Sequence, residues 1–184
     1  MAQSRRVEPQ RQKKPRPPLD EEALERIALF YVGRYATTRA RLATYLGRKV
    51  RERGWAGEGA PPIDRLVARL SGLGYVDDRA FAAARAASLH QRGYGERRIA
   101  GALQAAGIEE ADAAPAREQA RSGALEAALR FARRKRIGPY ADETPDRRMR
   151  DKAFAAMARA GHSMEVIRRV LDATPGEIPD CDNG

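Results

Sequence analysis

One helix ending occurs at even spacing as Leu46-Val50-Gly54-Trp55, Ile99-Leu103-Gly107-Ile108 and the weaker Ala153-Met157-Gly161-His162, and a fourth instance, Leu66-Leu70-Gly74-Tyr75, is out of phase with these three. Apolar residues four positions apart share one face of a helix, and a following glycine can adopt the left-handed conformation that ends the helix. The three glycines lie 53 and 54 residues apart. This even spacing predicts three tandem copies of a helical unit of about fifty residues, typical of repeat arrays that present an extended surface to a large partner.

The composition favours an all-α fold and an anionic partner. Alanine is abundant, β-branched residues are few, and no long alternation of apolar and polar residues indicates a strand. The net charge is +10 and the isoelectric point is about 10.3, mostly from arginine, because only five of the basic residues are lysines. A charge of this size points to nucleic acid, an acidic protein surface, or both.

A reducing cytoplasm is the expected compartment. The only cysteine, Cys181, has no partner for an internal disulfide. No segment approaches the ~18 consecutive apolar residues of a transmembrane helix, and no hydrophobic run follows the basic N-terminus as it does in a secretory signal. The sequence therefore predicts a cytoplasmic protein that does not act at a membrane.

The chain divides into five segments. Residues 1–18 are basic and rich in proline, so we expect a disordered tail that either grasps phosphates or serves only solubility. Helical repeats are expected at 19–76, 77–121 and 122–173, and an acidic, frayed tail at 174–184.

Capping residues predict where several helices begin. Asp20, Asp77 and Ser163 are expected N-caps, and either Thr37 or Thr38 caps the second helix. A further helix is expected to begin after Thr144-Pro145-Asp146.

Apolar spacing predicts the buried faces of these helices. The first helix is expected to bury a stripe that ends in Tyr31 and Tyr35, and the third to bury Leu73 before it ends at Gly74. Pro115 falls near the middle of an expected short, alanine-rich helix in the second repeat.

No arrangement of residues indicates catalysis, a metal or a cofactor. His90 and His162 have no neighbour at metal-ligand spacing, and the position of His162 after a helix-ending glycine favours packing. The pair Asp77-Asp78 is open to two interpretations, a weak metal site or a helix cap with a first-turn charge, of which the cap is favoured. We therefore expect neither a bound metal nor a cofactor, and a protein that is not an enzyme.

Basic clusters are the strongest functional signal. Arg34, Arg41 and Arg48 recur every seven residues and are expected to lie on one side. Further basic groups occur at 97–98, 133–136, 147–152 and 168–169. If the repeats stack in register, the groups on their second helices line up along one edge and match a regularly spaced anionic lattice. The predicted binding residues are Arg34, Arg41, Arg48, Lys49, Arg51, Arg97, Arg98, Arg147, Arg148 and Lys152.

The alternative for these residues is a solvated face threaded by intrahelical ion pairs, such as Glu52 with Arg48. For any one arginine this alternative is the stronger interpretation. The high net charge of the whole chain favours binding for the set.

One stretch resembles a known family. Leu70-Ser71-Gly72-Leu73-Gly74-Tyr75-Val76-Asp77-Asp78-Arg79-Ala80-Phe81-Ala82 is similar to the signature of the RecX family, the regulatory proteins of the RecA recombinase. The similarity continues through Gly93-Tyr94-Gly95-Glu96-Arg97-Arg98-Ile99, Leu103 and Gly107-Ile108. The close match covers about residues 63–108, and a looser match covers 24–171. Arg41-Leu42 stands where the family often has Glu-Leu, so the charge is reversed there.

The resemblance implies an all-helical, elongated arc of three three-helix repeats that docks along RecA–DNA filaments. Asp78 and Phe81 match structural signature positions, and Arg97 and Ile99 fall in a helix of the second repeat. Family members modulate the filament, most often by inhibiting its ATP hydrolysis, strand exchange and co-protease activity in recombination, DNA repair and the SOS response. Capping, disassembly and stimulation of the filament are all compatible with the resemblance.

Two functions follow as hypotheses. The first is a monomeric modulator of RecA filaments that also contacts single- and double-stranded DNA weakly, through charge. The second is a general helical DNA- or RNA-binding protein of the nucleoid, which would bind bare duplex whether or not RecA is present.

Overall fold

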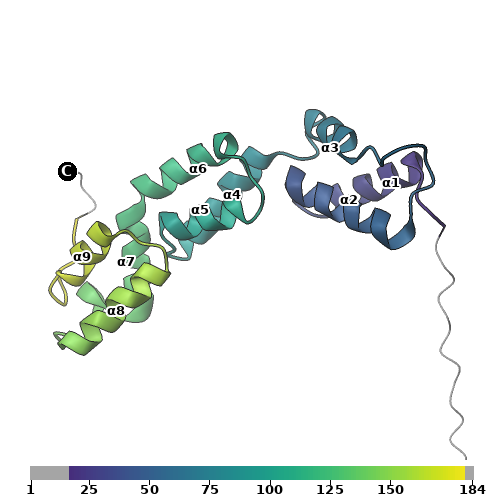
Figure 1. Ribbon diagram of the computed structural model, residues 1–184. Helices are drawn as coiled ribbons and strands as arrows, with labels where there is room; N and C mark the ends of the chain where they lie inside the picture. The colour runs from purple at the N-terminus through teal and green to yellow at the C-terminus, as the bar shows by residue number, and fades with distance from the viewer. Residues whose placement is uncertain (1–16, 181–184) are drawn as a thin grey trace, which may run out of the picture.

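The computed structural model describes residues 17–180, and its secondary-structure elements in that range are all helices, apart from one isolated bridge between Leu19 and Trp55 (Figure 1). The α-helices are α1 (Glu21–Val32), α2 (Arg39–Arg53), α3 (Ile63–Gly72), α4 (Asp78–Gln91), α5 (Glu96–Gln104), α6 (Glu110–Ser122), α7 (Ala124–Lys135), α8 (Arg147–Arg159) and α9 (Met164–Leu171). One 3-10 turn, η1 (Gly138–Tyr140), follows α7. The predicted basic tail lies outside the described residues except for its last two positions, and Cys181 lies outside them as well.

Three separate hydrophobic cores define three repeats. Helices α1–α3 form repeat 1 around Leu24, Leu46 and Leu70. Helices α4–α6 form repeat 2, whose core contains Ile99 and Leu103. Helices α7–α9 form repeat 3, with a core that includes Met157, Ile167 and Val170. The predicted all-α array of three three-helix repeats is confirmed, and we propose 19–76, 77–121 and 122–173 as its bounds.

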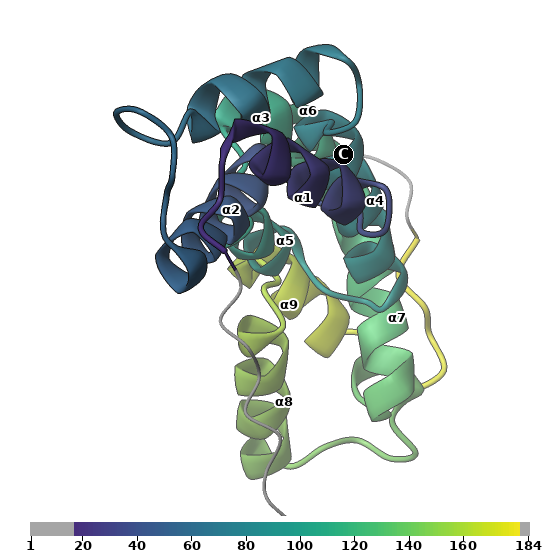
Figure 2. The same ribbon diagram turned by 90° about the vertical axis from the view of Figure 1, so that its right-hand side faces the viewer.

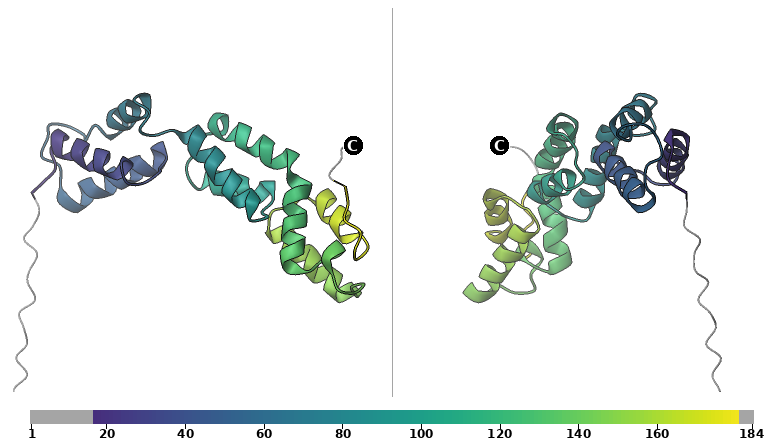
Figure 3. Two further views of the ribbon diagram at one scale, coloured as in Figure 1. Left: turned by 180° about the vertical axis from the view of Figure 1, so that it is seen from behind. Right: turned by 45° about the vertical axis from the view of Figure 1, so that its right-hand side comes forward.

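The repeats follow one another in an elongated, bent row (Figures 1 and 3). Helices α3 and α6 lie on the upper, outer side of the bend, and α2, α5 and α8 lie on the lower side. Seen from the repeat 1 end, α7 and α8 extend below the first two repeats (Figure 2). The second helix of every repeat thus faces the same side of the array.

The predicted caps form hydrogen bonds at the helix starts. The Asp20 carboxylate accepts a bond of 2.8 Å from the Ala23 backbone N–H, and Asp77 accepts one of 2.8 Å from Ala80. Thr38, not Thr37, caps α2, and Ser163 caps α9. Each such bond satisfies an N–H group that the helix itself leaves without a partner.

The two junctions between repeats share one geometry. At the start of α5, the backbone N–H of Gly95 donates to the Ala160 carbonyl at 3.0 Å, and that of Arg97 donates to the Gly161 carbonyl at 3.2 Å. At the start of α2, the Thr38 hydroxyl donates to the Ala106 carbonyl at 2.6 Å. Ala106 and Ala160 each precede a helix-ending glycine of the recurring pattern. The start of the second helix in one repeat therefore docks on the glycine corner of the next repeat.

The first glycine corner has no preceding repeat and is covered by the chain itself. The Leu19 backbone N–H donates to the Gly54 carbonyl at 2.9 Å, and the Ala56 N–H donates to the Leu19 carbonyl at 2.8 Å. Leu19 is fully buried beside this corner. The segment before α1 thus closes the end of the array, which in solenoids needs a cap.

Two of the predicted core residues are exposed. Tyr35 is 52% exposed because α1 ends at Val32, so the helical stripe does not reach it. Leu73 is 65% exposed because it lies in the turn after α3, where the chain leaves the helix axis. The prediction that both are buried was wrong.

Helix α6 is longer than expected and contains Pro115 within it. A proline in a helix removes one backbone hydrogen bond. The helix persists because Ala113, Ala116 and Ala120 are buried in the repeat 2 core together with Ala82 and Ala86 of α4. The small side chains allow the two helices to approach closely, and their packing offsets the lost bond.

Candidate basic binding edge

Helix α2 carries the first group of predicted binding residues. The Arg41 guanidinium lies 5.3 Å from the centre of the Phe81 ring of repeat 2. Arg48 and Lys49 lie over the Tyr45 ring, at 5.5 and 5.7 Å from its centre. Such cation–π contacts hold the positive charges in place without neutralising them.

Two members of this group are also ion-paired. Lys49 contacts the Glu52 carboxylate at 2.7 Å, and Arg48 contacts it at 3.7 Å. The intrahelical pairing considered as the alternative is therefore present at this point. Arg51 is exposed on the same helix.

Arg34 lies outside α2. Helix α1 ends at Val32 and α2 begins after Thr38, so Arg34 lies in the turn between them. Its guanidinium lies 6.0 Å from the centre of the Tyr35 ring. The seven-residue spacing therefore places only Arg41 and Arg48 on one helix.

Helix α5 carries the second group, Arg97 and Arg98, whose side chains are both exposed. Their backbones belong to the junction, because the Arg97 N–H donates to Gly161 and the Arg98 backbone packs against that glycine. The Arg98 guanidinium lies 5.3 Å from the centre of the Tyr94 ring. Junction and surface thus use different atoms of the same two residues.

Helix α8 carries the third group, Arg147, Arg148 and Lys152, all of them exposed. Asp146 caps the helix by accepting a bond of 2.6 Å from the Met149 backbone N–H. The neighbouring Arg150 has a different role, because it pairs with Asp172 and donates to the Leu171 carbonyl.

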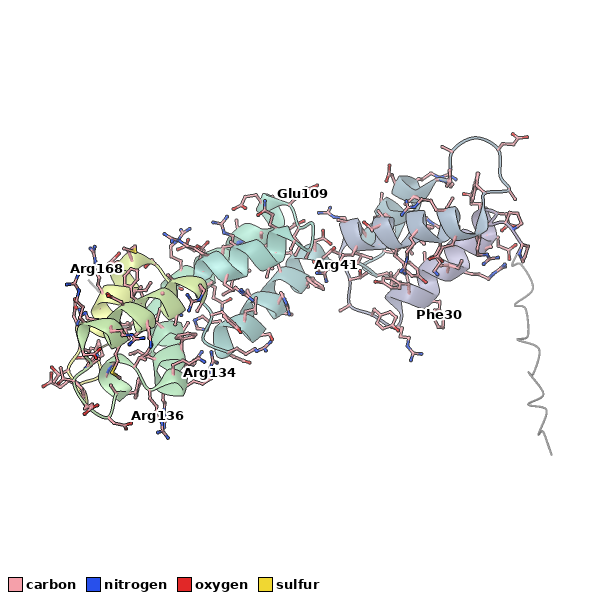
Figure 4. The ribbon with its side chains drawn as sticks, turned by 60° about the horizontal axis from the view of Figure 1, so that its bottom comes forward. Phe30, Arg41, Glu109, Arg134, Arg136 and Arg168 are labelled. Carbon is pink, nitrogen blue, oxygen red and sulfur yellow. The ribbon has the colours of Figure 1, made fainter. Side chains whose placement is uncertain are left out.

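The helices that carry these groups all lie on the lower side of the array (Figure 1). We call the set of ten predicted residues the basic edge. Figure 4 shows Arg41 in the space between repeats 1 and 2. Among residues 17–180, eight of the ten have no acidic ion-pair partner; Arg48 and Lys49 are the exceptions.

Two arginines outside the predicted set extend this surface at the second junction. The Arg92 guanidinium lies 5.9 Å from the centre of the Tyr94 ring, on which Arg98 also lies. Arg134 of α7 donates to the Arg92 carbonyl and lies over the Phe131 ring at 5.4 Å. The run 133–136 signalled charge in the sequence, but only the fold brings Arg134 next to a residue of another repeat.

An ion pair between buried Asp78 and the half-buried Arg39 joins repeats 1 and 2 at the first junction. Asp78 is 4% exposed and accepts a bond of 2.9 Å from the Arg39 backbone N–H and one of 3.2 Å from its side chain. The Arg39 side chain also contacts Asp112. The pKa of Arg39 is raised, chiefly by the hydrogen bond to Asp78. Asp77 caps a helix and Asp78 binds Arg39, so both carboxylates have structural roles. Among the described residues, no three acidic, histidine or cysteine side chains form a group that could hold a metal ion.

His162 lies inside the second junction. Its ring is 2% exposed, it packs edge-on against Phe131 with ring centres 5.7 Å apart, and its Nε2 lies 3.2 Å from the Gly93 carbonyl. Burial lowers the pKa of His162 to about 4, against the opposing effect of the bond to Gly93. The neutral ring therefore packs between repeats 2 and 3, in agreement with the packing role that its position favours.

This lowered pKa predicts loss of stability in mild acid. The unfolded chain protonates His162 near pH 6.5 and the folded chain only near pH 4, so stability is full above pH 6.5 and falls as the pH drops toward 4. The contribution lost is about 3 kcal/mol. Urea unfolding at several pH values would measure it. The variant His162→Phe should show a flatter dependence over this range, and an unchanged dependence would contradict the prediction.

In the part of the chain that the structure describes, no helix is long and apolar enough to cross a membrane.

Comparisons with known proteins agree with this architecture. Residues 77–116 match a family described as "RecX, second three-helix domain". The chain is 35% identical over 160 residues to the regulatory protein RecX of Myxococcus xanthus (strain DK1622), covering 83% of this chain and 86% of the relative. It is 31% identical over 157 residues to the regulatory protein RecX of Agrobacterium fabrum (strain C58 / ATCC 33970), with coverage of 83% and 84%.

Two crystal structures share the fold. The structure of RecX from Lactobacillus salivarius matches with a TM-score of 0.61 at 18% identity, covering 83% of this chain and 94% of that one. A second crystal structure of a regulatory protein RecX matches with a TM-score of 0.61 at 23% identity, covering 83% and 71%. At these identities the structural similarity concerns the fold alone.

Proposed function

We propose a function from one premise: the chain belongs to the RecX family of regulatory proteins. The proposed function is to bind RecA–DNA filaments and modulate them, most often by inhibiting ATP hydrolysis, strand exchange and co-protease activity in recombination and DNA repair. The proposal also includes weak, electrostatic contact with single- and double-stranded DNA, a monomeric state, a cytoplasmic location and no catalytic activity of its own.

One observation carries the proposal. Eight cations of the basic edge have no acidic ion-pair partner among residues 17–180, and all of them except Arg34 belong to α2, α5 and α8, the helices on the lower side of three successive repeats (Figure 1). Charges spaced along a rigid array can contact successive subunits of a filament or successive phosphates of its DNA. Many weak contacts of this kind add up to tight binding, so no single arginine has to dominate.

A second candidate function is a general nucleic-acid binder of the nucleoid. The arginines beside exposed or half-buried aromatic rings, such as Arg34 with Tyr35 and Arg98 with Tyr94, support it because this combination suits single strands. Such a protein would bind DNA equally well with or without RecA.

The deciding experiment measures RecA ATP hydrolysis on single-stranded DNA at near-physiological salt, with and without substoichiometric amounts of this protein. We expect strong inhibition far below one molecule per RecA subunit, which would also favour capping or disassembly over simple coating. Unchanged hydrolysis together with intact binding to bare DNA would refute the proposed function in favour of the nucleoid binder.

A further inference from the structure

An apolar groove lies where repeat 1 meets repeat 2. The turn before α2 contributes Thr37, the link from α3 to α4 contributes Tyr75, and α4 contributes Ala80, Phe81, Ala84 and Arg85. The groove has a volume of about 470 Å³. We call it the junction groove; it does not belong to the repeat cores, which lie inside each set of three helices.

Large apolar side chains stand exposed around the junction groove. Tyr75, in its wall, is 56% exposed. Leu73 and Tyr35, each next to a residue that lines it, are 65% and 52% exposed. Of these three side chains, Tyr75 is the one that lines the groove, and a large apolar side chain exposed in the wall of a concave surface is typical of an interaction site.

Thr37 supplies a second, independent sign of a bound partner. The residue is 6% exposed, it lines the junction groove, and its hydroxyl has no hydrogen-bond partner among the described residues. The adjacent Thr38 hydroxyl, in contrast, donates to Ala106 at 2.6 Å. Leaving a buried hydroxyl without a partner costs free energy. The oxygen itself is covered, so a bound group would recover that free energy once the Thr37 side chain rotates toward the groove.

The charges beside the groove favour an anionic occupant. Arg85 lines it, and Arg41 lies over the Phe81 ring in its wall. Neither arginine has an acidic ion-pair partner within residues 17–180. Asp77 is the one carboxylate in the lining. It accepts the Ala80 N–H as the cap of α4, so its negative charge is directed at the start of that helix.

We propose that the junction groove binds an acidic segment of a partner protein that carries an apolar side chain. The apolar side chain would pack on Ala80 and Ala84, flanking carboxylates would meet Arg41 and Arg85, and a polar group would bond the Thr37 hydroxyl. The identity of the partner rests on the proposed function, under which the acidic segment belongs to the RecA protein of the filament. Protein is favoured over nucleic acid because Ala80 and Ala84 suit an apolar side chain, while the lining offers successive bases only one uncovered ring, that of Tyr75, since Arg41 covers the Phe81 ring.

The test uses two matched variants of the full chain. Ala84→Glu places a negative charge in the groove, and Ala83→Glu places the same charge on the neighbouring exposed position of α4, which does not line the groove. Glutamate is a good helix former, so both variants should fold. The probe is a fluorescein-labelled peptide, Glu-Asp-Glu-Leu-Phe-Glu-Asp-Glu, followed by fluorescence anisotropy, with a labelled oligo-dT strand as the second probe.

We expect Ala84→Glu to weaken peptide binding at least tenfold while Ala83→Glu stays within about twofold of the unmodified chain, where tenfold corresponds to about 1.4 kcal/mol. Equal effects of the two variants, or no peptide binding to the unmodified chain at about 1 mM, would overturn the proposal. Selective weakening of oligo-dT binding by Ala84→Glu would also overturn it, because the groove would then hold nucleic acid.

The same variants on RecA filaments separate this proposal from the proposed function. A chain that binds the peptide in the groove but does not bind filaments refutes the proposed function and leaves the groove as a protein-binding site. A chain that binds filaments equally well with Ala84→Glu and Ala83→Glu refutes the assignment of RecA as the partner in the groove.

Discussion

Replacement of Gly161 by alanine is expected to destabilise the protein by about 3–4 kcal/mol, from a left-handed backbone that costs an L-residue about 1–2 kcal/mol and from two junction hydrogen bonds worth about 1 kcal/mol each. Gly161 has φ = +92°. A Cβ at this position would also collide with the backbone nitrogen of Arg98. The start of α5 would have to move, and the bonds from Gly95 to Ala160 and from Arg97 to Gly161 would break.

The measurement is urea unfolding, combined with hydrogen exchange of the Gly95 and Arg97 amides, which should lose protection first. Gly101→Ala is the matched control, because Gly101 lies within α5 and a Cβ there would meet nothing within 4 Å. The control should stabilise the protein by about 0.5–1 kcal/mol. A Gly161→Ala variant as stable as the unmodified chain would show that the junction does not depend on the close approach.

The recurring glycines also explain why so much of the fold could be predicted from the sequence. Helix ends and caps depend on residues close together in the chain, so Asp20, Asp77 and Ser163 mark them directly. The spacing of Gly107 and Gly161 gave the repeat, and in the structure these corners are also the points where one repeat docks on the next. The local and the long-range roles of these glycines therefore coincide.

Contacts between distant residues could not be predicted in this way. The pair Arg39 and Asp78 joins positions 39 residues apart, and nothing near either residue indicates the other. Exposure of Leu73 was equally hidden, because a helical pattern continues through it while the backbone turns away one residue earlier. The junction groove was hidden for the same reason, since it is lined by the turn before α2, the link after α3 and α4, which are distant in the sequence.

The basic edge was predictable as chemistry and only partly as geometry. Local runs identified Arg97-Arg98 and Arg147-Arg148, because charge is visible in the sequence whatever the fold. Of the residues spaced by seven, only Arg41 and Arg48 share a helix, because Arg34 lies in the turn before Thr38. Arg92 was not singled out, because its neighbour Arg134 comes from the next repeat. The assignment of the basic edge as a binding surface stays a proposal, which charge-reversed variants test.

Reversal of two charges at the centre of the basic edge is the direct test of that surface. The double variant Arg97→Glu with Arg98→Glu is expected to raise the concentration for half-maximal inhibition of RecA ATP hydrolysis at least tenfold, because it replaces two attractive charges with two repulsive ones. The protein should remain folded, since both side chains are exposed and the junction uses only their backbone. Binding should also depend less steeply on salt, because fewer ionic contacts are made.

The matched control reverses two charges that are not members of the basic edge. Arg168 and Arg169 are both exposed on α9, and Arg168 lies at the far end of the array from Arg41 (Figure 4). Arg168→Glu with Arg169→Glu changes the net charge by the same amount, so any effect of overall charge appears in both variants. If inhibition falls equally in the two, net charge alone drives binding and the α5 pair has no special place in it. If only the Arg97 and Arg98 variant fails, the position of charge along the lower side of the array is what the partner recognises.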